Sequence, residues 1–162
     1  MPGRARPPNL TPTPERGDGA ARLRPPLPSD APALAALAGE LGYPSTAEQL
    51  LGRLAALSPT DASVIVATDA DDVPIGWCQV ELHRTLVEPL SALILGLVIG
   101  DGHRSEGIGA ELLAAAERWA KARGCKQLVV GTRITRERAH RFYAREGYEV
   151  SKTSYFLTKG LD

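Results

Sequence analysis

The chain has 162 residues, 43% of them hydrophobic, and its formal net charge is zero. This length suits one globular domain with a sizeable core, and the balanced charge argues against nucleic acid as a partner. No apolar run reaches the roughly 20 residues of a membrane helix and no signal peptide is visible, so a cytoplasmic protein without membrane contact is expected. Cys78 and Cys125 lie apart in apolar surroundings, which predicts two buried thiols and no metal site.

The first segment is rich in Pro, Gly and Arg and holds almost nothing that could enter a core. Residues 1–21 are therefore predicted to be a disordered tail, and residues 22–162 to be the folded domain. The arginines of the tail could bind anions weakly, but a solvated tail is the simpler interpretation.

Two helices are expected before the first long strand. After a short strand in RLR, Ser29 and Asp30 are predicted to cap an Ala/Leu helix that ends near Gly42. In STAEQLLGRLAAL, Glu48 follows Ser45 by three residues, which is the capping-box pattern of a second helix.

The rest of the chain alternates between strand and helix patterns. Two antiparallel strands are predicted around a tight turn near Asp71 and Asp72, and the apolar run of residues 90–99 predicts a central strand buried on both faces. An amphipathic helix stopped by Gly124, a strand in CKQLVVGT and a helix closed by Gly147 follow. YEVSKTSYFLTKGL predicts two short closing strands.

The stretch GDGHRSEGIGAELL concentrates glycines between a strand and a helix. The first N–H groups of a helix lack intrahelical partners and carry the positive end of its dipole, so they suit an anion. Gly107 and Gly109 have no Cβ to keep a bulky anion away, and Arg104 adds a charged donor. The pattern predicts a site for a pyrophosphate, although a flexible loop or a plain nucleotide site stays open; neither the P-loop nor the dinucleotide fingerprint is complete.

With its flanks, LVIGDGHRSEGIGAELLAAAERWAKARGC resembles the acetyl-CoA-binding motif of the GNAT superfamily of N-acetyltransferases, Arg/Gln-x-x-Gly-x-Gly/Ala. AHRFYAREGY, about 40 residues on, resembles the second signature of that family, and the likeness extends from about Leu23 to Leu161. It implies a single-domain GNAT-like α/β fold, with a mixed central sheet of about six to seven strands, about four flanking helices and splayed central strands. It also implies an acyltransferase that moves acetyl from acetyl-CoA to a primary amine.

The resemblance also implies a cofactor site. Pantetheine would enter the gap beside the strand that ends at Val98 and Ile99, and backbone amides of the following loop would wrap the pyrophosphate. The expected cofactor-binding residues are Val98, Ile99, Arg104, Ser105, Glu106, Gly107, Ile108, Gly109, Ala110, Arg136 and Tyr143. The amine would attack the thioester directly, and Tyr143 would protonate the leaving thiolate; its other interpretation is a core aromatic beside Phe142.

The general base is less plain from the sequence. Many relatives carry Glu on the strand that leads into the motif, where this chain has Leu93 or an apolar neighbour. Glu81 and His83 share one face of the preceding strand, so either could act as the base, directly or through water; they could equally be a solvated pair. Glu106 within the anion loop and Arg136 in place of a common Asn also depart from the family pattern.

Tyr43 and Trp77 are candidate walls of the acceptor site, although Tyr43 could equally be a packing residue. His103 and His140 are expected to be solvated or near phosphate rather than catalytic. A small-molecule amine is the first acceptor to consider, and a protein N-terminus or lysine the second. A CoA-binding module without turnover is the alternative to an enzyme. Dimers are common in the family, so a homodimer is one open oligomeric state.

Overall fold

The computed structural model describes residues 21–162, so the predicted tail lies outside the described residues except for Ala21, which is buried. The chain divides into two compact units, and their described parts are residues 21–130 and 131–162. The elements of the first unit are β1 (Arg22–Arg24), η1 (Pro28–Asp30), α1 (Ala31–Leu41), α2 (Ala47–Ala56), β2 (Ala62–Thr68), β3 (Pro74–His83), β4 (Ser91–Ile99), η2 (Asp101–His103), α3 (Ile108–Ala122) and β5 (Leu128–Val130).

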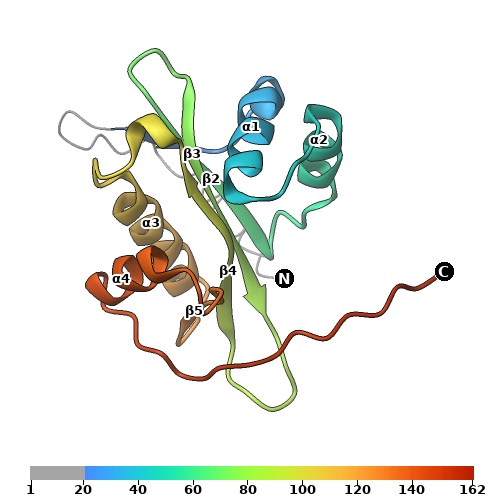
Figure 1. The fold of residues 1–162 in the computed structure, drawn as a ribbon. Coiled ribbons are helices and arrows are strands. Elements are labelled where there is room, and N and C mark those ends of the chain that lie inside the picture. The colour runs from blue at the N-terminus through green and yellow to red at the C-terminus, as the bar shows by residue number, and fades with distance from the viewer. Residues whose placement is uncertain (1–20) are drawn as a thin grey trace, which may run out of the picture. The chain divides into compact units, whose positions relative to one another are not determined.

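The first unit is built on a mixed sheet with the strand order β1-β2-β3-β4-β5 (Figure 1). Strands β1 to β4 pair antiparallel with their neighbours, and β5 joins β4 in parallel. The α/β fold class and the mixed sheet are as predicted, but the described residues form five strands rather than six or seven.

Helices cover both faces of this sheet. Helix α3 contacts β2, β3 and β4, whereas α1 contacts β3 and β4 from the opposite side (Figure 1). The largest fully buried side chains include Leu34 of α1, Ile108 and Leu112 of α3, and Val66 and Val80 of the sheet. The core thus lies on both sides of β3 and β4, and it fixes these strands and the start of α3 relative to one another.

The helix ends follow the local sequence signals, except at the start of α1 and at the start of α2. Helix α1 ends at Gly42, which has a φ of 101°, as predicted. Thr46, not Ser45, caps α2: its hydroxyl accepts a hydrogen bond from the backbone N–H of Gln49, and the Gln49 side chain accepts one from Thr46. Either register fits the Ser/Thr-x-x-Glu/Gln pattern, so the pattern alone could not separate them.

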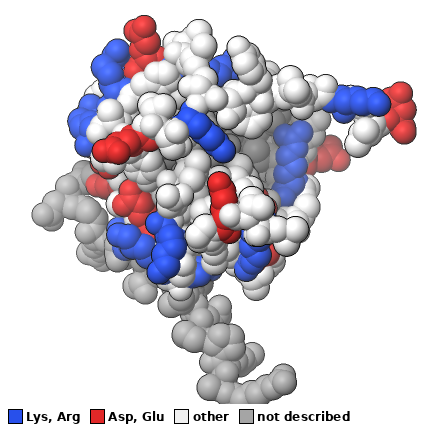
Figure 2. Space-filling model, turned by 90° about the horizontal axis from the view of Figure 1, so that it is seen from below, with Lys and Arg blue, Asp and Glu red and all other residues white. Residues whose placement is uncertain are grey.

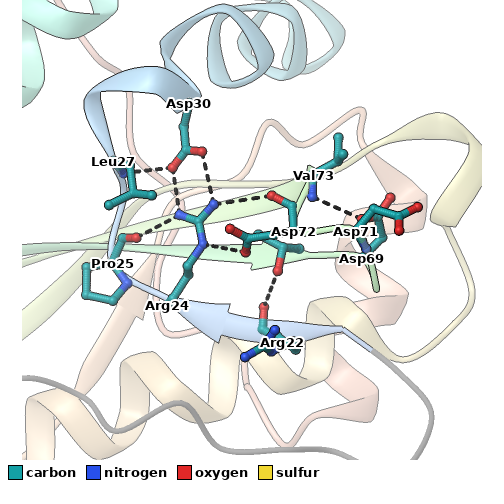
Figure 3. Close-up of polar contacts among 10 residues, drawn as sticks. Arg22, Arg24, Pro25, Leu27, Asp30, Asp69, Asp71, Asp72 and Val73 are labelled. Carbon is teal, nitrogen blue, oxygen red and sulfur yellow. Dashed lines mark hydrogen bonds and ion pairs between the residues drawn. The ribbon is translucent and has the colours of Figure 1, made fainter.

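Asp30, predicted as a helix cap, makes a different set of bonds (Figure 3). Its carboxylate accepts two hydrogen bonds from the Arg24 guanidinium, at 2.7 and 3.0 Å, and one from the backbone N–H of Leu27. Arg24 also donates to Asp72 in the turn between β2 and β3, at 2.8 Å. This Arg24 cluster therefore ties the first strand, the entry to α1 and the β2–β3 turn together.

The second unit contains one helix, α4 (Glu137–Arg145), closed by Gly147 at a φ of 89° as predicted. The two closing strands predicted after it are absent: within residues 148–162 no strand forms. Their β-branched and aromatic residues favour extended structure, but a strand is stable only when a neighbour satisfies its backbone groups.

On the face seen in Figure 2, basic and acidic side chains are interspersed among uncharged ones. No helix among the described residues is long and apolar enough to cross a membrane. Cys78 is buried, which raises the pKa of its thiol to about 12, whereas Cys125 is only partly buried, so the prediction of two buried thiols is half right.

Candidate active site

Strand β3 presents the predicted base candidates on one face. Trp77, Glu81 and His83 alternate with the buried Cys78 and Val80, so they share the opposite face of the strand. Glu81 and His83 are half-buried, and across the sheet they face Leu93 and Ser91 of β4. The structure thus places both candidate bases on the same strand face as the predicted acceptor wall.

A β-bulge interrupts the pairing of β3 and β4 beside these residues. Gln79 pairs with Gly96 but Val80 pairs with Ile94, which leaves Leu95 as the extra residue, and its side chain is exposed. A Cβ on Gly96 would lie 2.5 Å from the Trp77 ring, so only glycine lets the indole lie over β4 here. The indole Nε1 is buried and has no hydrogen-bond partner among the described residues.

Beyond the bulge, β4 runs past the end of its other neighbour. The parallel pairing with β5 ends at Ile94 and Val130, and residues 95–99 continue without a strand on that side in the described part of the first unit. That β4 splays from this neighbour beside Val98 and Ile99, as the family resemblance implies, stays a prediction. Main-chain groups on this free edge can bind an extended ligand as a neighbouring strand would.

The glycine-rich loop connects the end of β4 to the start of α3. Ser105 and Gly107 have positive φ angles of 68° and 81°, and Gly107 is the N-cap of α3 with no side-chain cap. The first-turn amides of Ile108, Gly109 and Ala110 therefore lack a capping side chain. A Cβ on Gly107 would meet open space, so the loop leaves room for a ligand against these amides. An anion is the ligand that this arrangement suits.

Arg104 is held beside the loop by two carboxylates. Its guanidinium lies 2.9 Å from Asp101 and 3.8 Å from Glu40, and its Nε donates to the carbonyl of Ile99 at 3.4 Å. Glu40, at the end of α1, also accepts a hydrogen bond from the backbone N–H of Asp101. Sequence reasoning did not pair Glu40 with Arg104, because nothing local in either segment signals the contact.

Glu106 lies 3.5 Å from the ring of His103, and both side chains are largely exposed, so this carboxylate has a local cationic partner when the imidazole is protonated. Tyr43 follows the end of α1 and its side chain is 61% exposed, so it is not a packing residue in the first unit. Among residues 21–162, no group of three or more His, Cys, Asp or Glu could hold a metal ion.

Tyr143 and Arg136 belong to the second unit. The Tyr143 ring packs edge-on against Phe142 and Tyr148, with ring centroids 5.0 and 5.6 Å apart. Arg136 stands at the N-cap of α4 without a side-chain cap bond, and His140 of α4 is hydrogen-bonded to the carbonyl of Arg133 at 2.8 Å. His140 is thus bound to its own backbone loop.

Comparison with known proteins identifies the family of this chain. The family model described as "Acetyltransferase (GNAT) family" matches residues 34–148, which include the glycine-rich loop and α4. The chain belongs to this family. As a GNAT acetyltransferase it is an acetyl-CoA-dependent enzyme that acetylates amines, which confirms the family resemblance of its sequence motifs.

Named relatives support the same class of activity. An aminoglycoside N(6')-acetyltransferase type 1 from Stenotrophomonas maltophilia is 28% identical over 145 residues, 86% of this chain and 94% of the relative. An aminoalkylphosphonate N-acetyltransferase from Salmonella typhimurium is 46% identical over 66 residues, 40% of this chain and 41% of the relative. The structure of an aminoglycoside 6'-N-acetyltransferase from Acinetobacter baumannii superposes with a TM-score of 0.76 at 16% identity, covering 88% and 99% of the two chains. That last likeness shows the GNAT fold alone.

Proposed function

We propose that this GNAT enzyme transfers acetyl from acetyl-CoA to the primary amine of a small molecule, by direct attack within a ternary complex. The observation that carries the proposal is the uncapped start of α3 behind Gly107, where free amides and open space coincide. A pyrophosphate there would receive hydrogen bonds from the amides of residues 108–110 and the charge of Arg104. Glu106 would turn to His103 and leave this space to the phosphates.

The free edge of β4 would receive the pantetheine arm. Residues 95–99 expose backbone groups beyond the last pair with β5, and the edge leads directly into the glycine-rich loop. An extended amide-bearing chain can satisfy such an edge as a strand does. Bound acetyl-CoA supplies an activated acyl group as a thioester. The side chains of this enzyme then have to bind the amine, remove its proton and protonate the sulfur.

The proton transfers are assigned to the residues that the sequence singled out. The amine nitrogen forms a bond to the acetyl carbon, the carbon–sulfur bond breaks, and the thiolate leaves. We assign Glu81 or His83 to accept the proton of the amine, directly or through water, because both are half-buried on the face that carries Trp77. We assign Tyr143 to protonate the thiolate, because a phenol with an ordinary pKa of about 10 matches a basic leaving group.

A small-molecule acceptor is favoured by the named relatives. The named relatives act on aminoglycosides and aminoalkylphosphonates. Trp77, whose buried indole N–H lacks a partner among the described residues, and Tyr43, whose ring is exposed, would form walls of the acceptor site.

The cofactor site is tested by calorimetric titration of acetyl-CoA into the wild type and the Gly107→Val variant. Valine would place methyl groups where the phosphates lie and would strain a residue at positive φ, so binding should weaken at least tenfold. Gly124→Val is the matched control: Gly124 also has a positive φ, of 80°, and open space around its Cβ, but it lies at the other end of α3. If both variants lose affinity equally, or if neither loses affinity, the glycine-rich loop is not part of the cofactor site.

The acceptor is tested by release of the CoA thiol in the presence of a panel of amines: an aminoglycoside, an aminoalkylphosphonate, free lysine and a peptide with a free N-terminus. We expect turnover with at least one of the two small-molecule classes and a fall in kcat of at least tenfold in Tyr143→Phe. Turnover only with the peptide would replace the small-molecule acceptor by a protein N-terminus. An unchanged kcat in Tyr143→Phe would remove the phenol from the chemistry.

A further inference from the structure

Strand β3 carries a glutamine on the same face as the candidate bases. Gln79 lies two residues before Glu81, so the two side chains point to the same side of the sheet, and both are half-buried. Neither side chain makes a hydrogen bond or an ion pair among the described residues. A polar group that loses water without gaining a partner costs free energy, so this pair points to a ligand that supplies the missing partners.

The neighbouring strands offer Gln79 and Glu81 no polar side chain. Their cross-strand neighbours are all apolar or lack a side chain: Ala62 and Val64 on β2, and Leu93 and Gly96 on β4. The Trp77 ring lies over Gly96, so the β4 side of Gln79 is apolar as well. All of these residues belong to the first unit. Partners for the amide and the carboxylate therefore have to come from above the sheet rather than from within it.

The charges on this face of the sheet favour one kind of ligand. Strands β2, β3 and β4 contain no lysine or arginine at all, and Glu81 is the only acidic residue within them. A phosphonate or carboxylate would therefore meet the charge of Glu81 with no strand cation to offset it. An ammonium group would pair with Glu81, and a neutral polar group beside it would bind the Gln79 amide. The face thus suits a cationic acceptor with neutral polar groups.

We propose that Gln79 is a specificity-determining residue of the acceptor site and selects amines that carry a hydroxyl group. The proposal rests on the proposed function and makes Glu81, one of its two candidate bases, the residue that meets the amine. Side chains two residues apart on a strand lie roughly 7 Å apart, so an ammonium at Glu81 brings a hydroxyl of the same molecule within reach of Gln79. The amide both donates and accepts, so it satisfies a hydroxyl in either direction. Hydroxylated amines such as amino sugars are therefore preferred to aminoalkylphosphonates.

The role of Gln79 is tested with acceptors that differ by one hydroxyl: an amino alcohol and the corresponding alkylamine, and an amino sugar and its deoxy analogues. Release of the CoA thiol gives kcat/KM for each. Gln79→Leu should lower the preference for the hydroxylated member of a pair about fivefold, the effect of one lost hydrogen bond. A general loss of folding would lower both members equally and leave the ratio unchanged.

Gln127→Leu is the matched control, because Gln127 is exposed and lies just before β5. This variant should keep the wild-type ratio. Gln79→Met, with an unbranched side chain of similar length, repeats the test in case leucine disturbs the packing beside Trp77. An unchanged ratio for every pair in both Gln79 variants would overturn the proposal.

The wild-type preferences separate failure of this proposal from failure of the proposed function. We expect kcat/KM for a hydroxylated amine to exceed that for an aminoalkylphosphonate at least tenfold. A wild type that acetylates small amines but prefers the phosphonate, or does not distinguish the members of any pair, would overturn the role of Gln79 and leave the small-molecule acceptor in place. A wild type that acetylates only the peptide would overturn the proposed function, and the role of Gln79 with it.

Discussion

Two arginines of this protein each lie between two carboxylates, and their burial separates their roles. Arg24 is 16% exposed and binds Asp30, which is only 5% exposed, together with Asp72. Arg104 and Glu40 are 37% and 38% exposed, and their partner Asp101 is more exposed still. The same ion-pair chemistry therefore holds the fold together at the first site and stays open to exchange at the second.

With the proposed role of Arg104 in cofactor binding, one residue type would serve stability at the first site and ligand binding at the second. At the Arg24 cluster the carboxylate of Asp30 has three donors and little water, so removing one partner leaves a buried charge unpaired (Figure 3). At Arg104 solvent screens the pairs, so the phosphate of the proposed cofactor would replace Asp101 or Glu40 at small cost. Four predictions test this contrast.

The largest expected effect is at the buried cluster. Asp30→Ala should lower the free energy of unfolding by about 3 kcal/mol, because Arg24 and the Leu27 N–H lose their acceptor in a buried place. Urea denaturation followed by circular dichroism measures this. Asp72→Asn changes a half-exposed partner of the same arginine and should lower the free energy of unfolding clearly less. Equal losses would mean that burial does not distinguish the two carboxylates.

Acid should weaken the same cluster. The hydrogen bonds from Arg24 hold the pKa of the Asp30 carboxyl below its ordinary value, against the opposing effect of burial. A carboxyl with a lowered native pKa contributes its full stability above the ordinary value of about 3.9 and loses it as the pH falls through the native pKa. Urea unfolding between pH 6 and pH 2.5 should show a steeper loss below pH 4 in the wild type than in Asp30→Asn. Parallel curves would contradict this.

Arg104→Gln should leave the fold intact and weaken acetyl-CoA binding about tenfold, close to the roughly 1.5 kcal/mol of one charge-assisted hydrogen bond. Calorimetric titration gives the Kd, and thermal unfolding checks stability. Arg84→Gln is the control, because Arg84 is another exposed arginine in one ion pair, with Asp61 at 3.1 Å. A large loss of stability in Arg104→Gln would mean that Arg104, like Arg24, holds the fold together.

The smallest expected effect is at Glu40. Glu40→Gln keeps an acceptor for the Asp101 N–H but removes a negative charge beside the anion loop, so acetyl-CoA should bind about threefold more tightly, or roughly 0.6 kcal/mol. Glu48→Gln on α2 controls for a general change of charge. Weaker binding in Glu40→Gln would show that the carboxylate positions the loop rather than competing with the ligand.

Elements with a local signal were predicted well from the sequence. Gly42 and Gly147 end helices because each takes a positive φ that other residues avoid, and the acidic turn after β2 forms where Asp69 accepts bonds from Asp71 and Val73. The start of α3 behind Gly107 was likewise predictable. The prediction of two closing strands was wrong, because a sequence pattern indicates what a segment can form but not whether a partner strand is present.

The sequence by itself determined the family motif, the glycine-rich loop and most helix boundaries, since these depend on backbone angles and neighbours a few residues apart. Only the tertiary structure decided which distant polar groups meet: Glu40 accepts a hydrogen bond from the backbone N–H of Asp101 across 61 residues, and Arg24 donates one to Asp72 across 48. It also decided the bulge at Leu95 and the Trp77 ring over Gly96. Such contacts arise from how helices and strands pack on one another, and packing joins segments whose separation in the sequence carries no signal of their proximity.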